Sequence, residues 1–75
     1  MVRDEGRPSL MLHINGERRT VPAPMTVAGL LRHLGIDERQ VAVERNLEIV
    51  RRGTFAEVEL EDGDRLEIVT FVGGG

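Results

Sequence analysis

The spacing of the apolar residues changes at Thr26, and this change limits the folds that are open to the chain. Before Thr26, apolar residues such as Leu12 and Ile14 alternate with polar ones, which is the period of a half-buried strand. After it they follow the period of a helix, at Val27, Leu30, Leu31 and Leu34. Because one short helix can cover only one face of a sheet, we expect an α+β domain with its helix on one side.

Local signals set the ends of these first elements. Asn15-Gly16 predicts a two-residue hairpin turn between strands at 10–14 and 17–21, because a type I′ turn needs positive φ at both central residues. Thr26 is a candidate N-cap, and Gly35 suits the left-handed residue that ends a helix. The sequence therefore predicts a hairpin followed by one capped helix.

The second half of the chain contains further strands. We expect strands at 40–44 and 48–50, a short helical turn within 54–60, a turn at 61–64 and a last strand at 65–72. The last strand is the longest apolar one, so we place it in the centre of the sheet, parallel to the first strand. This is the ubiquitin-like β-grasp arrangement, a mixed sheet of four to five strands with one main helix on one face.

Composition excludes several classes of function. The 75 residues are enough for one small domain, and the absence of cysteine excludes disulfides, thiolate metal sites and a cysteine nucleophile. His13 and His33 lie far apart without carboxylates at ligand spacing, so we expect no metal and no cofactor. A net charge of -3 and two phenylalanines as the only aromatic residues argue against nucleic acid as a partner. The sequence has no apolar run of membrane-spanning length, and we expect a cytoplasmic protein.

The two ends of the chain differ from the domain between them. Residues 1–9 are charged and lack an apolar period, so we expect a flexible extension before a domain at 10–72. Gly73, Gly74 and Gly75 directly follow the last strand and cannot stabilise it, because glycine loses the most conformational entropy on ordering. They are either a frayed end or a flexible tail that carries a carboxylate through a narrow tunnel into another protein.

The last strand is apolar on both faces near its end. Leu66 and Ile68 can face the helix, but Val69, Phe71 and Val72 make the far end of the strand more apolar than a strand covered on one side should be. Either another segment of the domain covers these side chains, or they form a surface for a partner.

Four segments of the sequence resemble the ThiS-type sulfur carriers of thiamine thiazole biosynthesis. They are LHINGE at 12–17, TVAGLLRHLGI at 26–36, VAVERN at 41–46 and DGDRLEIVTFVGGG at 62–75. The last is the most specific, because the strand runs straight into terminal glycines.

The resemblance implies a carrier and not an enzyme. It implies that an E1-like, ThiF-type enzyme adenylates Gly75, that a sulfur donor system converts it to a thiocarboxylate, and that a ThiG-type thiazole synthase uses the sulfur. Gly73 and Gly74 would thread into the partners. The apolar residues of the last strand would dock on them, namely Val69, Phe71 and Val72.

The sequence departs from the family in two places, and other interpretations stay open. Residues 1–10 precede the usual start of family members and are expected to be an extension or a cloning remnant. Asn46-Leu47 replaces the family's frequent asparagine-glycine, so we expect a second turn of a different type. The alternatives are a molybdopterin-synthase-type small subunit, another sulfur carrier, a non-covalent β-grasp module or a protein-conjugating modifier.

Overall fold

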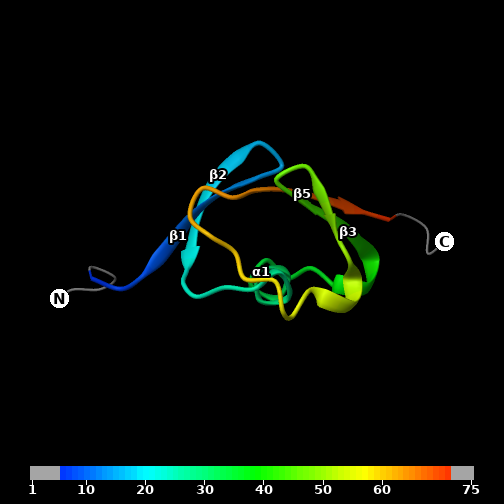
Figure 1. The fold of residues 1–75 in the computed structure, drawn as a ribbon, viewed down its shortest axis with the longest axis horizontal. Helices are drawn as coiled ribbons and strands as arrows, with labels where there is room; N and C mark the ends of the chain where they lie inside the picture. Colours follow the sequence, from blue (N-terminus) through cyan, green and yellow to red (C-terminus); the bar gives the residue numbers. More distant parts are fainter. Residues whose placement is uncertain (1–5, 72–75) are drawn as a thin grey trace.

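Residues 6–71, which the computed structural model describes, form one five-stranded sheet and one α-helix. In chain order the elements are β1 (Ser9–Ile14), β2 (Glu17–Pro22), α1 (Val27–His33), the 3-10 turn η1 (Glu38–Gln40), β3 (Val41–Arg45), β4 (Glu48–Val50), the 3-10 turn η2 (Arg52–Thr54) and β5 (Arg65–Thr70). The strand order is β2-β1-β5-β3-β4, and α1 lies across one face (Figure 1). The predicted β-grasp fold is confirmed.

The last strand lies in the centre of the sheet, as predicted. β5 runs parallel to β1, with Ile14 opposite Leu66, and antiparallel to β3, with Val43 opposite Ile68. It ends at Thr70 and not at residue 72, although the N–H of Phe71 still donates to the Gln40 carbonyl at 2.8 Å. Figure 1 shows that this end of β5 and the start of β1 lie on opposite sides of the molecule.

The ends of α1 carry the predicted caps. The Thr26 side chain accepts a hydrogen bond from the backbone N–H three residues later at 3.0 Å, which satisfies a free donor of the first turn. Gly35 has a φ of 76°. Its N–H donates to the Arg32 carbonyl at 3.1 Å, and the N–H of Ile36 donates to the Leu31 carbonyl at 2.8 Å. This pair of bonds is a Schellman motif, which closes the helix.

The core lies between α1 and the sheet, and the segment after η2 closes one end of it. Residues from every layer are buried there, namely Leu12, Ile14, Val21, Val27, Ala28, Leu30, Leu31, Val41, Val43, Phe55, Leu60, Leu66 and Ile68. A 3-10 turn lies at Arg52–Thr54, and the helical turn predicted within 54–60 follows it, since the N–H groups of Glu57 and Val58 donate to the Thr54 carbonyl at 2.8 and 3.1 Å. The turn ends before Leu60 because the backbone there is extended: the Leu60 N–H donates to the Met25 carbonyl at 2.9 Å, and Glu59 forms a bridge with Thr26.

The two hairpin turns have the same backbone geometry. Asn15 and Gly16 have φ values of 51° and 84°, as predicted for the first turn. Asn46 and Leu47 have φ values of 52° and 73°, so the prediction of a different second turn is wrong. Two-residue connections between twisted strands favour this turn, and here the preference prevails although one position carries a leucine.

Candidate functional site

The site predicted from the sequence is the end of β5 and the residues after it. Val69 and Phe71 are described, and 56% and 51% of their surfaces are exposed. Residues 72–75, which include Val72 and the three glycines predicted to carry the chemistry, lie outside the described residues. Within residues 6–71 no segment buries Val69 or Phe71, so the first of the two alternatives for these side chains is not observed.

Alternation along β5 separates its core side chains from its exposed ones. Leu66 and Ile68 are buried under α1, being 2% and 8% exposed. Val69 points to the opposite face, because successive side chains in a strand alternate. It lies beside Ala42 of β3, its partner in the sheet register. The end of β5 therefore presents apolar groups on the face that α1 does not cover.

Two further exposed apolar residues lie on the β3–β4 hairpin, and they were not predicted. Leu47 is 90% exposed and Ile49 is 71% exposed. On the uncovered face of the sheet, Ile49 of β4 lies opposite Glu44 of β3, and Glu44 lies opposite Glu67 of β5. Val69 lies two residues beyond Glu67 on β5, so Ile49 and Val69 belong to neighbouring rows of side chains across the strands. The sequence contained the signal, because the adjacent residues Ile49 and Val50 of one strand must face opposite sides.

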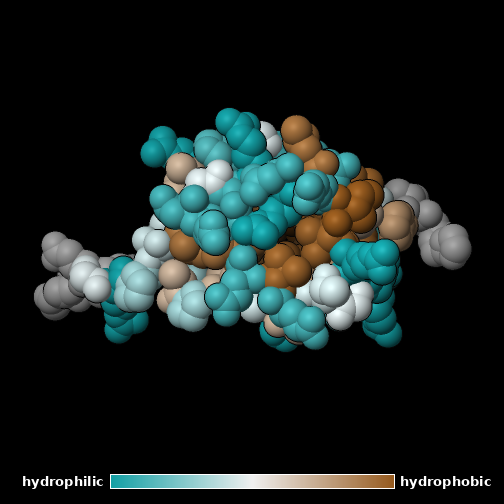
Figure 2. All heavy atoms as spheres, in the orientation of Figure 1, coloured by the Kyte–Doolittle hydropathy of each residue, from teal (hydrophilic) through white to brown (hydrophobic). Residues whose placement is uncertain are grey.

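We call the set Leu47, Ile49, Val69 and Phe71 the apolar face. Figure 2 shows hydrophobic atoms gathered on the side of the molecule where the β3–β4 hairpin and the end of β5 lie, whereas the opposite side is mostly hydrophilic. Within this face Glu44 and Glu67 lie between Ile49 and Val69 in the register, so exposed apolar side chains and carboxylates share the same side of the sheet.

Asparagines from both hairpin turns hold β5 from its two sides. The Asn15 side chain accepts from the N–H of Ile68 at 2.7 Å and donates to its carbonyl at 3.1 Å. The Asn46 side chain accepts from the N–H of Arg65 at 3.0 Å. These bonds satisfy backbone groups of β5 that a neighbouring strand would otherwise have to satisfy. The two asparagines thus hold β5 at Arg65 from the β3 side and at Ile68 from the β1 side.

Asp64 anchors the turn before β5. The carboxylate is 6% exposed and accepts from Arg45 Nε at 2.8 Å, from the Glu61 N–H at 2.8 Å and from Asn46 Nδ2 at 3.1 Å. Burial acts to raise the pKa of Asp64, but these three hydrogen bonds outweigh it and leave the pKa below its ordinary value. Asp64 is therefore an ionised structural group.

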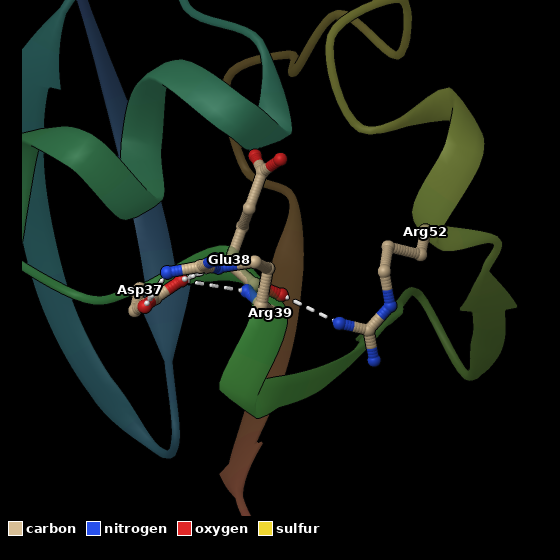
Figure 3. A network of polar contacts seen from close by, with 4 residues as sticks. All are labelled: Asp37, Glu38, Arg39 and Arg52. Carbon is tan, nitrogen blue, oxygen red and sulfur yellow. Dashed lines mark hydrogen bonds and ion pairs between the residues drawn. The ribbon is translucent and has the colours of Figure 1, made fainter.

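Arg52 supports the other end of β5 through η1. Its guanidinium donates to the Glu38 carbonyl at 2.8 Å and to the Val41 carbonyl at 3.2 Å. These carbonyls flank Gln40, whose own carbonyl accepts from the N–H of Phe71. Figure 3 shows the Arg52 side chain extending from η2 toward η1. Arg52 thus positions η1, whose Gln40 carbonyl accepts the hydrogen bond from Phe71.

The described residues contain no group of three His, Asp or Glu side chains that could hold a metal ion. The apolar face carries no nucleophile beside a base.

The comparisons with known proteins agree on one family. The ThiS family model matches residues 12–75. The sulfur carrier protein ThiS of Bacillus subtilis is 42% identical over 66 residues, which cover 87% of this chain and 100% of that protein. The crystal structure of the thiamine biosynthesis protein ThiS from Geobacter metallireducens superposes with a TM-score of 0.75 at 35% identity, covering 88% of this chain and 100% of that one.

Longer relatives also match. A thiazole synthase of Paramagnetospirillum magneticum is 59% identical over 66 residues, which cover 88% of this chain but 20% of that protein. This chain thus spans about a fifth of the thiazole synthases to which it is similar. Together with the fold, the matches show that the chain belongs to the ThiS family, the family of the sulfur carrier proteins of thiamine biosynthesis.

Proposed function

We propose that this chain carries sulfur as a thiocarboxylate on the carboxyl group of Gly75 and gives it to the thiazole ring of thiamine. Family membership supports the carrier role. The observation that carries the proposal furthest is the geometry of β5, which is hydrogen-bonded on both sides and exposes Val69 and Phe71 just before the glycines. A fixed strand with an apolar surface at its end can present a tail to a partner in one orientation.

The partners supply the chemistry, and the chain is their cosubstrate. An E1-like, ThiF-type adenylating enzyme would direct a carboxylate oxygen of Gly75 to the α-phosphate of ATP, so that pyrophosphate leaves and an acyl-adenylate forms. A sulfide equivalent from the sulfur donor system would then displace AMP and leave the thiocarboxylate. The chain itself contributes the acyl group and its delivery.

The residues before Gly75 would have two separate roles in recognition by the partners. Gly73 and Gly74 lack side chains, so they can pass through a tunnel that excludes other residues. Val69, Phe71 and Val72 would dock on the adenylating enzyme and on a ThiG-type thiazole synthase. We place these reactions in the cytoplasm. Among the described residues, no helix has the length and apolar character needed to cross a membrane.

Intact mass spectrometry of the full chain tests the proposal. After incubation with ATP, the adenylating enzyme and the sulfur donor, the mass should rise by the difference between one sulfur and one oxygen atom. A chain that lacks Gly75 is the matched control and should keep its mass. An unchanged mass of the intact chain under these conditions contradicts the proposal, and function without Gly75 would favour a non-covalent β-grasp module.

A further inference from the structure

Leu47 combines a backbone conformation that favours glycine with a side chain that lies in solvent. Its φ of 73° is in the left-handed region, where a Cβ atom crowds the backbone and glycine does not. The side chain is 90% exposed, so it gains almost nothing from the core. Neither the turn nor the packing of the domain accounts for a leucine here. A strained residue without a structural reason is a reason to look for a functional one.

The side chain of Leu47 borders the face of the sheet that α1 leaves uncovered. It lines a recess together with Glu44 and Glu67, whose register places them on that face, and with Arg65 and His13. Ile49, two residues further on, is 71% exposed beside Glu44. Leu47 and Ile49 thus add exposed apolar side chains on the same face as Val69 and Phe71, on the far side of Glu44 and toward the tip of the β3–β4 hairpin.

Two carboxylates lie between the apolar side chains. Glu44 and Glu67 are directly opposite each other on neighbouring strands, an arrangement of like charges that destabilises a sheet. Within residues 6–71 neither glutamate forms an ion pair, since the two ion pairs there join Arg39 to Asp37 and Arg45 to Asp64. Within these residues Arg65 lines the same recess but forms no ion pair with either glutamate, so two carboxylates share one guanidinium there. A partner with a basic side chain between apolar ones would complement the remaining negative charge as well as the apolar groups.

We infer that Leu47 and Ile49 belong to a docking surface for a thiazole synthase, which receives Leu47 in an apolar hollow and sets a basic side chain against Glu44 and Glu67. This inference rests on the proposed function and extends its docking site from the end of β5 to the β3–β4 hairpin. A thiazole synthase is the occupant because the relative with 59% identity carries the matching segment within a thiazole synthase polypeptide.

The replacement Leu47→Gly separates docking from folding. Glycine accepts the left-handed conformation, so the variant should unfold at a temperature no lower than the wild type. Its affinity for a purified thiazole synthase should fall about tenfold, as for the loss of a large apolar contact at an interface. Ile49→Ala should act in the same direction. Thr20→Ala is the control, since Thr20 pairs with Met11 on the β2 side of the same face.

A double replacement tests the charges. Glu44→Gln with Glu67→Gln should weaken binding and make the remaining affinity less sensitive to salt, because exposed charges are screened by ions. Isothermal titration calorimetry at low and high ionic strength measures both effects. An affinity that rises on this replacement contradicts a basic group in the partner.

The outcomes distinguish this inference from the proposed function. If Leu47→Gly binds thiazole synthase as tightly as the wild type, the docking role of Leu47 is wrong. If Leu47→Gly loses affinity only for the adenylating enzyme, Leu47 binds that enzyme and not the thiazole synthase, and the inferred partner is wrong. If the wild type acquires sulfur but does not bind a thiazole synthase, the inference fails and the sulfur chemistry stands. If the wild type binds a thiazole synthase but acquires no sulfur, the proposed function fails instead.

Discussion

The side chain of Asn15 forms two hydrogen bonds with the backbone of a single residue of β5, Ile68. β1 ends at Ile14, so the amide of Asn15 takes the place of the next strand residue and extends the parallel ladder by one step. The same residue has a φ of 51° and forms the hairpin turn. One asparagine therefore closes the first hairpin and fixes the central strand.

The first prediction concerns this contact. Asn15→Gly keeps the backbone conformation of the turn but removes both side-chain bonds, which leaves two part-buried groups of Ile68 without partners. The free energy of unfolding should fall by about 1–3 kcal/mol. Urea denaturation measures it, and a change close to zero would show that water replaces the amide at no cost.

Asp64 gives a prediction that depends on pH. Its pKa in the folded chain lies below the ordinary value, so the carboxylate stabilises the fold above the unfolded pKa of about 4 and loses this contribution as the pH falls through the folded pKa. Asp64→Asn should therefore lower the free energy of unfolding by about 1–3 kcal/mol near neutral pH, where it also leaves Arg45 without its partner. The difference between variant and wild type should shrink in acid. Urea denaturation as a function of pH checks this, and a difference independent of pH would contradict it.

Arg52 and Arg39 form a matched pair of arginines. Arg52→Ala removes two hydrogen bonds to backbone carbonyls near Gln40, whereas Arg39→Ala removes only an exposed ion pair with Asp37, which solvent screens (Figure 3). Hydrogen exchange of the Phe71 amide should accelerate in the first variant and stay unchanged in the second. Equal exchange in both would mean that Arg52 does not support the end of β5.

Strain at Leu47 leads to a prediction about stability alone. Leu47→Gly should raise the free energy of unfolding slightly, by up to about 1 kcal/mol, because relief of the left-handed strain exceeds the added entropy of the unfolded chain. Thermal unfolding of the isolated domain measures this. A marked loss of stability would show that Leu47 has a contact in the fold that its exposure does not reveal.

The fold was predictable from the sequence because its signals are local and agree with one another. Asn15-Gly16 specified the first turn, Thr26 and Gly35 specified the ends of α1, and the apolar run of β5 placed that strand in the centre. The type of the second turn was predicted wrongly because leucine at position 47 was taken to disfavour a turn with positive φ, whereas the twist of the strands favours that turn. The geometry of the hairpin therefore outweighed the preference of leucine for negative φ.

The candidate site was predictable only in part. Val69 and Phe71 stood out because they follow buried residues in a strand with one covered face. Ile49 was missed because its role depends on the register of β3 and β4, which places it opposite Glu44 of β3 and so one strand away from β5. The support from Arg52 was not predicted either, since nothing in the sequence indicates which carbonyls a guanidinium will reach.

The most direct test of the carrier role locates the sulfur on the chain. Trypsin cleaves after Arg65, the last basic residue, and releases residues 66–75 as one peptide. After reaction with ATP, the adenylating enzyme and the sulfur donor, tandem mass spectrometry should find one oxygen replaced by sulfur at Gly75. Sulfur elsewhere in the chain, or an unmodified peptide from a reaction in which ATP was consumed, would contradict the account.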